Sequence, residues 1–480
     1  MDGRPKHSTK RCKVRGRDVI MEKERKIDEL KDIISHIKNQ LKKFCTEWVI
    51  NGIYTNQNQI RFSEKNIDIH KNWDATRINI FLSKKRRTSE ITIDDLRIKS
   101  IDQTLKYCEN LLNSSKRNTN FKHLPKGPFK YDSSIQNKIY DENVVKLEEH
   151  AIDYVEKSIE ACIRQGAVRA AGSFFYGYLH NFLETSEGIE GNYKRSNLNF
   201  RIRAFAEDMY ATGEALTVST HLEKDFDPIA AATEAGQICK QAIGGKKGSP
   251  GIYNIIIYPK VSTEIQAPTP ALAMNKYVMK MGLSWLIGKK KGDKIGNAKV
   301  TIRDDGTREY GLATSPFDEE GVPRKRTILI KDGIIQNFFT NTSLSEKDEE
   351  STANAGITIP KPTNTVFKPG DHTLEELMEI SEGPTLLITS TWYTRYQSYA
   401  PPGVFSSLPK DGIFLVENHG RNLTPLRELR INSNQYEMLE NTIALGKENK
   451  QVSTWLSTSN NTVFAPYMLI KNIKMTTGTK

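Results

Sequence analysis

Apolar residues repeat with a helical period near the start of the chain. Between Ile27 and Phe44 they recur at steps of three and four, so they share one face of a helix whose other face carries Lys, Asp and Glu. Short runs rich in β-branched and aromatic residues follow and predict a small antiparallel sheet. These runs cover residues 59–62, 67–69 and 77–82. A second helix is expected over about 100–112. Helices on a small sheet therefore predict an N-terminal α+β domain at 21–122, after a basic, disordered tail at 1–20.

The next part of the chain, residues 123–245, mixes helical and strand patterns. It opens with a linker that carries Pro and Gly, and an apolar stripe then predicts one helix over 143–163. Strand-like alternation covers 167–178 and 198–205. Asp227 before Pro228 is a typical N-cap and first-turn pair, and it predicts a helix over the Ala-rich run that follows. These patterns indicate a middle α+β segment.

Strand patterns dominate residues 246–480. A buried strand is expected at 252–258, and residues 327–330 are expected to pair with 334–338 across a Gly-containing turn. Further strands are predicted at 385–394, 412–417 and 426–431, with helices near 374–380 and 435–445. The predicted fold class is α+β: an N-terminal α+β region with helices on small antiparallel sheets, followed by a large β-rich C-terminal domain.

Composition narrows the class of protein. The 480 residues are 37% hydrophobic and 27% charged, which suits two or three domains with sizeable cores. No apolar stretch is long enough to span a bilayer, and the first twenty residues lack the apolar core of a secretory signal. The five cysteines lie far apart and are interpreted as reduced thiols. We therefore expect a cytoplasmic protein with no membrane partner.

The net charge of +12 raises the question of a nucleic-acid partner. The basic clusters at 84–87, 289–291 and 324–326 are scattered and are not interleaved with aromatic residues that could stack on bases. Solvated loop charge is the favoured interpretation, and a nucleic-acid partner is disfavoured. The alternative is a basic nucleic-acid-associated protein that uses residues 1–20 as an arm.

Several short motifs occur in an order that resembles the TldD/PmbA (TldE) family of metallopeptidase-complex proteins, and in particular an archaeal-type member. Each motif is weak alone, but their collinear order is fairly specific and extends over most of the chain. The markers are the segments 61–63, 185–188, 251–259, 284–292, 304–307, 317–322, 354–356, 366–370 and 391–395.

The resemblance implies a heterodimeric cytoplasmic peptidase. In the family, the TldD-type subunit carries a His-Glu-x-x-x-His helix that binds a metal ion together with a later cysteine, and a metal-bound water is the nucleophile. The matching interval here, 259–283, has no His, no Cys and one carboxylate, Glu264, while Pro268 and Pro270 forbid a regular helix. No cysteine follows Cys239. The chain is therefore similar to the TldE-type partner, with no metal ligands and no cofactor of its own and with zinc expected in a TldD-like subunit.

Other residues could take part in acid–base catalysis or in cation binding. His419 lies close to Glu417, and such a pair can act as acid and base, although a solvent-exposed hairpin corner is favoured. The acidic run Asp318, Glu319 and Glu320 could bind a hard cation, but a charged turn before Gly321 is favoured.

The run 391–396 offers candidates for binding a peptide or a partner. Trp392, Tyr393 and Arg395 are residue types that anchor such contacts. The alternative is a strand whose alternate aromatic residues are buried, and that alternative leaves Arg395 without a role.

The predicted function is that of a TldE/PmbA-like subunit that pairs with a TldD-like metallopeptidase and helps to admit unfolded or modified peptides. It is predicted to be non-catalytic. Two alternatives stay open: a self-contained peptidase with an unrecognised metal site, which would act as a homodimer, and the nucleic-acid-associated protein.

Overall fold

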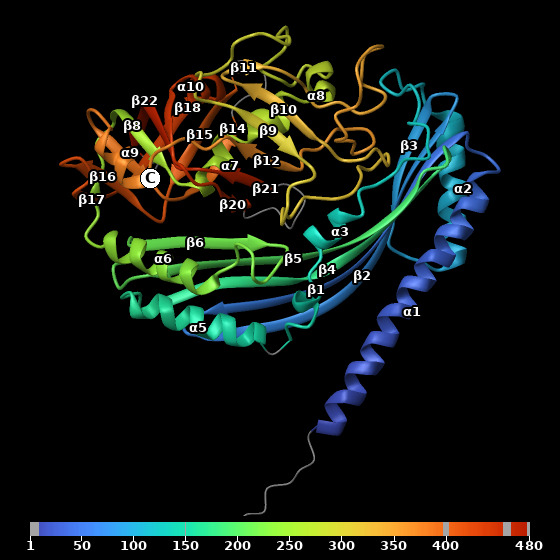
Figure 1. The fold of residues 1–480 in the computed structure, drawn as a ribbon, viewed down its shortest axis with the longest axis horizontal. Coiled ribbons are helices and arrows are strands. Elements are labelled where there is room, and N and C mark those ends of the chain that lie inside the picture. Colours follow the sequence, from blue (N-terminus) through green and yellow to red (C-terminus); the bar gives the residue numbers. More distant parts are fainter. Residues whose placement is uncertain (1–8, 149, 397–402, 455–461, 478–480) are drawn as a thin grey trace, which may run out of the picture. The chain divides into compact units, whose positions relative to one another are not determined.

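The computed structural model describes residues 9–148, 150–396, 403–454 and 462–477 (Figure 1). Two compact units divide the chain: unit 1 comprises 1–56, 74–128 and 179–192, and unit 2 comprises 57–73, 129–178 and 193–480. Four long strands have residues in both units: β1 (Glu47–Ser63), β2 (Asn66–Lys84), β4 (Arg169–Thr185) and β5 (Glu190–Phe205). The short strands expected from the sequence are therefore parts of much longer ones.

In unit 1, two amphipathic helices contact each other. They are α1 (Thr9–Leu41) and α2 (Ile98–Ser114), and α2 also contacts β3 (Arg87–Ile93). Strand β3 pairs with β2 from Ile78↔Ile93 to Lys84↔Arg87. Helix α1 buries the expected stripe, which includes Leu30, Ile34, Ile37 and Leu41. It also begins at Thr9, inside the range predicted as a disordered tail, and residues 1–8 of that range lie outside the described residues.

The four long strands belong to one sheet with the order β3-β2-β1-β4-β5-β6, and its part in unit 2 carries two helices on one face (Figure 1). Helices α5 (His150–Arg164) and α6 (Pro228–Gln241) share a core with alternate residues of these strands, such as Phe174, Phe200 and Ile202. Strand β6 (Thr212–Ser219) pairs with β5 from Leu198↔Ser219 to Phe205↔Thr212. Side chains alternate across a strand, so the other residues face away from this core.

Local features of the sequence and backbone set where helices α6 and α5 begin. Asp227 caps α6 as predicted, because its Oδ1 accepts a hydrogen bond from the Ala230 amide at 2.9 Å. The single helix expected over 143–163 is wrong: the chain forms α4 (Glu142–Val145) and then α5, and Glu148 between them has a positive φ of 36°. A positive φ interrupts a right-handed helix. Upstream of both lies α3 (Ser134–Ile139).

The rest of unit 2 contains two further sheets that share one apolar core. One has the order β11-β10-β9-β12-β21-β20, and the other has the path β14-β15-β18-β22-β8-β13-β16-β17-β7, with β19 paired to β22. The strands of the first sheet are β9 (Ile302–Asp305), β10 (Arg326–Lys331), β11 (Ile334–Ile335), β12 (Asn364–Phe367), β20 (Lys450–Val452) and β21 (Thr462–Ala465). Those of the second are β7 (Lys246–Lys247), β8 (Gly251–Ile257), β13 (Thr385–Ile388), β14 (Thr391–Tyr396), β15 (Val404–Pro409), β16 (Ile413–Glu417), β17 (Asn422–Arg427), β18 (Leu429–Asn434), β19 (Thr442–Leu445) and β22 (Met468–Thr477).

Short helices connect these strands: η1 (Pro259–Val261), α7 (Ser262–Ile265), the π-helical turn η2 (Thr269–Ala273), α8 (Lys276–Lys280), α9 (Leu374–Glu379) and α10 (Gln435–Glu440). The β-rich C-terminal domain and the α+β class are thus confirmed. Three boundaries are corrected. The strand predicted at 385–394 is two strands, the one predicted at 426–431 is divided at Glu428, whose φ is 61°, and the helix predicted at 435–445 ends early and continues as β19.

No helix in the described part of the chain is both long and apolar enough to cross a membrane. Cys108, Cys162 and Cys239 are buried and carry no disulfide, and Cys45 is half-buried and also free. Burial raises the pKa of Cys162 to about 12 and that of Cys239 to about 11. These thiols are therefore structural apolar groups rather than reactive nucleophiles.

Candidate functional site

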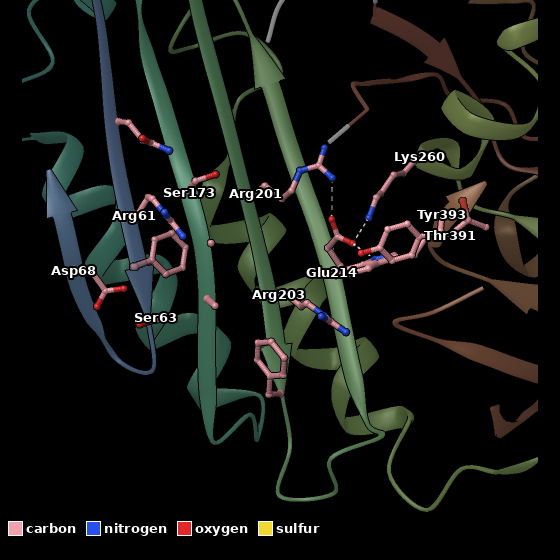
Figure 2. A pocket seen from close by; sticks show the side chains of 16 residues that line it. Arg61, Ser63, Asp68, Ser173, Arg201, Arg203, Glu214, Lys260, Thr391 and Tyr393 are labelled. Carbon is pink, nitrogen blue, oxygen red and sulfur yellow. Dashed lines mark hydrogen bonds and ion pairs between the residues drawn. The ribbon is translucent and has the colours of Figure 1, made fainter. Parts of the chain in front are cut away.

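A pocket of about 620 Å³ lies within unit 2. Its wall combines residues of β1, β2, β4, β5 and β6 with Lys260 of η1 and the start of β14, as Figure 2 shows. This volume is typical of small-molecule and peptide-side-chain sites. The pocket is therefore large enough to receive part of a ligand.

Strand alternation explains why charged side chains line this pocket. In β5, Phe200, Ile202 and Ala204 belong to the core under α5 and α6, so Arg201 and Arg203 project from the opposite face. The same alternation places the side chains of Gln59 and Arg61 of β1 and Ser173 of β4 on the pocket side. One face of the sheet is thus apolar core and the other is a polar wall.

Gly172 of β4 allows two strands to approach closely at this wall. A Cβ atom at this position would lie 2.2 Å from the Arg201 carbonyl oxygen and 2.5 Å from the Phe62 ring. Neither neighbour is free to move, because one is backbone and the other ring is 2% exposed. A larger residue would therefore displace the strand that carries Arg201.

Glu214 of β6 is the centre of the polar wall. Its Oε1 accepts a hydrogen bond from Arg201 Nη1 at 2.9 Å, and its Oε2 accepts from Lys260 Nζ and from Ser390 Oγ at 3.2 Å. Trp392 Nε1 lies 3.4 Å from the same oxygen. Burial opposes ionisation, but the charges of Lys260 and Arg201 lower the pKa of Glu214 to about 2. The carboxylate is therefore ionised, and both of its oxygens accept hydrogen bonds.

Arg203 is held in the same wall by an ion pair and two rings. Its Nε donates to Asp411 Oδ1 at 2.7 Å, and its guanidinium carbon lies 4.9 Å from the Phe205 ring centre and 4.6 Å from that of Trp392. Lys410 Nζ lies 4.9 Å from the Trp392 ring centre. Two cations near one indole fix its position through cation–π attraction.

Glu264 of α7 lies beside this network without lining the pocket. Its Oε2 accepts hydrogen bonds from Thr394 Oγ1 at 2.7 Å and Thr391 Oγ1 at 3.3 Å. Burial raises the pKa of Glu264, and the threonine hydroxyls and the Lys260 charge oppose that shift. Glu264 thus ties η1 and α7 to β14.

Comparison with known proteins identifies the C-terminal part of the chain. Residues 250–477 match the model of the PmbA/TldA metallopeptidase C-terminal domain. This part of the chain, just under half of its residues, is thus similar to the C-terminal domain of that family. A metalloprotease of Methanocaldococcus jannaschii is 35% identical over 96 residues, which are 19% of this chain and 21% of that protein. A zinc metalloprotease TldD homolog of Saccharolobus solfataricus is 25% identical over 274 residues, 54% of this chain and 60% of that protein. The matches thus stop well short of the full length of these relatives.

Solved structures share the fold over nearly the whole chain. TldE from Thermococcus kodakarensis superposes with a TM-score of 0.75 at 16% identity, over 92% of this chain and 99% of that one. A candidate modulator of a DNA gyrase from Thermotoga maritima gives a TM-score of 0.80 at 19% identity, over 93% of this chain and 100% of that one. At these identities the comparison establishes the fold.

The residues present do not fit the zinc centre that the TldD/PmbA resemblance implies for TldD-type subunits. Interval 259–283 supplies Lys260 and Glu264 to the pocket region, and the ammonium of Lys260 already bonds to the nearest lining carboxylate, Glu214. A buried ammonium repels a divalent ion and competes for its ligands. In the described ranges, no group of three or more His, Cys, Asp or Glu side chains is placed to hold a metal ion.

Lys260 and Ser390 also have the spacing of a serine–lysine pair, with Nζ 2.9 Å from Oγ. Ser390 is fully buried, however, and its hydroxyl donates to Glu214. Burial lowers the pKa of Lys260, and the Glu214 charge opposes that shift. The Lys260 Nζ atom lies within ion-pair distance of Glu214 Oε2. A nucleophile must reach a substrate, and this hydroxyl has no exposed surface.

Two of the three binding residues predicted from the sequence lie at the pocket. Trp392 and Tyr393 line the pocket, while Arg395 lies on the same strand outside the lining. The register of β14 against β15 shifts between Trp392 and Arg395, and Tyr393 has a φ of 51°. Exposure still alternates along this strand, because Tyr393 and Arg395 are exposed while Trp392, Thr394 and Tyr396 are half-buried. The peptide-binding role of Trp392, Tyr393 and Arg395 stays a prediction.

His419 and Glu417 lie at the β16–β17 turn and are not pocket-lining residues. The His419 Nδ1 atom is 3.1 Å from the Glu379 carbonyl oxygen, and Glu417 Oε2 accepts a hydrogen bond from Thr424 Oγ1 at 2.5 Å. Both side chains are exposed. Their arrangement is that of a polar hairpin corner, with each group bonded to a structural neighbour.

The acidic run 318–320 forms the expected turn, but two of its side chains are buried. Asp318 is 2% exposed and accepts three backbone N–H groups, from Glu320, Val322 and Ala355. Glu320 is fully buried, and its Oε1 has no hydrogen-bond partner among the described residues. Burial and the Asp318 charge raise the pKa of Glu320 to about 8. This pair is a structural feature separate from the pocket.

Sequence reasoning missed Arg201, Arg203 and Glu214 as site residues. The signal was present in β5, where two arginines alternate with Phe200 and Ile202, since charges at every second position of a strand share one face. Nothing local connects Glu214 with Lys260, which is distant in sequence. Their meeting depends on the tertiary fold.

Proposed function

We propose that this chain is the TldE-type partner subunit of a cytoplasmic TldD/TldE-type metallopeptidase complex and does not itself cleave peptides. Its TldD-like partner carries the zinc. This subunit contributes a binding wall that receives segments of unfolded or modified peptide. The pairing of two homologous chains suits an approximately two-fold interface.

One observation carries the proposal: interval 259–283 contributes a lysine and one carboxylate to the pocket region, where a TldD-type sequence would carry its metal ligands. Lys260 and Glu214 are already paired with each other. The TldE fold match and the lack of His-Glu-x-x-x-His anywhere in the chain support the same assignment.

Co-purification tests the proposal. A tagged copy of this chain is expressed with an untagged TldD-type chain from the same organism, and complex formation is followed by size-exclusion chromatography. We expect an equimolar complex that cleaves an unfolded polypeptide, whereas this chain alone does not. Replacing both zinc-binding histidines of the TldD-type chain should abolish cleavage without breaking the complex. Cleavage by this chain alone, or failure of the two chains to associate, would overturn the proposal.

A further inference from the structure

The pocket wall carries more positive than negative charge. Four cationic side chains line it, Arg61, Arg201, Arg203 and Lys260, against two anionic ones, Asp68 and Glu214. Asp411, just outside the lining, pairs with Arg203. With Asp411 included, the cationic side chains still outnumber the anionic ones by one. Positive potential in a cavity with apolar walls is focused rather than screened by water.

The ion pairs within the pocket wall show which cationic side chains can still bond to a ligand. Arg201 and Lys260 are both bonded to Glu214. Arg203 donates through Nε to Asp411 and through Nη2 to Thr212, which leaves Nη1 without a hydrogen-bond partner among the described residues. Arg61 is exposed and forms no ion pair with any residue in the described ranges. Two guanidinium groups can therefore bond to a ligand.

The rest of the wall is apolar and aromatic. Phe62, Phe205, Trp392 and Tyr393 contribute to it, and Tyr393 is 58% exposed. Arg203 packs between the Phe205 and Trp392 rings, so its guanidinium is held in place before a ligand arrives. A fixed guanidinium pays little entropy when it forms the paired hydrogen bonds that match a carboxylate.

We infer that this pocket binds a carboxylate of a peptide, with Arg61 and Arg203 as the anion-binding residues and Trp392, which contacts Arg203, as an aromatic part of the wall. The inference rests on the proposed peptide-binding role and names the chemistry that the pocket selects. Asp68 and Glu214 oppose a dianion at the same wall, which favours a single carboxylate. That carboxylate is either the C-terminus or an acidic side chain of the peptide.

Fluorescence anisotropy with labelled six-residue peptides and the full chain tests this inference. One peptide ends in a free acid, and its matched peptide ends in an amide. A second pair, both amidated, differs by Glu against Gln at the last position. We expect a carboxylate-bearing peptide to bind about tenfold more tightly than its neutral match. The first pair reports a terminal carboxylate and the second a side-chain carboxylate.

Arg61→Gln should reduce this preference to less than about threefold, because an exposed strand residue without an ion pair can be replaced with little effect on folding. The matched control is Lys65→Gln. Lys65 is an exposed cation in the adjacent β1–β2 turn and does not line the pocket, so its loss removes the same net charge and should keep the preference.

Equal affinity for acid and neutral peptides in both pairs would overturn the inference, as would an equal loss of preference in both variants. The result is distinguishable from a failure of the proposed function, since binding is measured on this chain alone and complex formation is measured separately. Tight binding without charge preference would overturn the inference and leave the proposed peptide-binding role in place.

Discussion

The ammonium of Lys260 and the carboxylate of Glu214 form an ion pair that is buried on both sides, with side chains 13% and 6% exposed. Lys260 comes from η1 and Glu214 from β6, so the pair joins the β-rich C-terminal domain to the layer that carries α5 and α6. Removing one partner of a buried pair leaves an uncompensated charge in a medium of low polarity. This pair is therefore a structural requirement of the pocket.

Lys260→Met should destabilise the protein by about 3 kcal/mol, because Glu214 would keep Arg201 but lose its second cation. Urea unfolding followed by circular dichroism measures the change. Lys146→Met is the matched control, since the Lys146–Glu142 pair has side chains 70% and 67% exposed and should be worth less than about 0.5 kcal/mol. Equal losses of unfolding free energy in the two variants would show that the buried pair stabilises the protein no more than the exposed pair.

The pH dependence of stability should reveal Glu320. Its folded pKa of about 8 lies above the ordinary value of 4.5, so the folded state keeps a proton that the unfolded state releases. Its contribution is fully present below about pH 4.5 and is lost as the pH rises through about 8. Glu320→Gln should therefore match the wild type near pH 5 and become more stable than it near pH 9.

Thermal melting from pH 5 to 9 tests this expectation, with Glu319→Gln as the control. Glu319 is adjacent but partly exposed and pairs with Lys361 at 2.7 Å. A Glu320→Gln protein that loses stability relative to the wild type at high pH would contradict a raised pKa for Glu320 in the folded protein.

Trp392 should contribute to peptide affinity mainly through its ring. Trp392→Ala is expected to weaken binding of a carboxylate-bearing peptide by at least about tenfold, as for aromatic residues at the centre of binding sites. Trp392→Phe keeps a ring next to Arg203 and Lys410 and loses only the long contact to Glu214, so it should retain most of the affinity. Trp73→Leu, outside the pocket, is the control. Equal affinities for all variants would exclude Trp392 from the site.

His419 should be dispensable for peptide cleavage by the reconstituted complex. Because His419 has a φ of 56°, Asn is the suitable replacement, as it tolerates this left-handed conformation better than Ala. His419→Asn should change the cleavage rate less than about twofold, since the His419 ring contacts the backbone carbonyl of Glu379 in α9 and does not line the pocket. A loss of a hundredfold or more would favour the alternative of a catalytic site in this chain.

The sequence predicted those elements whose signals are local. The stripe of α1, the Asp227 cap of α6 and the hairpin of β10 and β11 depend on spacing and turn chemistry within a few residues. The helix break at Glu148 and the strand break at Glu428 each occur at a residue with a positive φ. Glutamate is not a residue type that predicts this conformation. Helices and strands were consequently predicted to be continuous at these points.

The candidate site was predictable only where one segment carries it. Trp392 and Tyr393 lie in a single aromatic run, and the missing metal ligands of 259–283 are visible in one interval. The pocket itself needs Arg61 of β1, Arg203 of β5 and Lys260 of η1 on one wall. Pairing between distant segments sets that arrangement, and periodicity within each segment does not encode it.

The zinc content of this chain, purified alone and beside a TldD-type chain from the same organism, tests the central claim most directly. The account predicts essentially no tightly bound metal in this chain and about one ion per molecule in the TldD-type chain. A near-stoichiometric metal content in this chain alone would contradict the account, because it would require a ligand set that the described residues do not form.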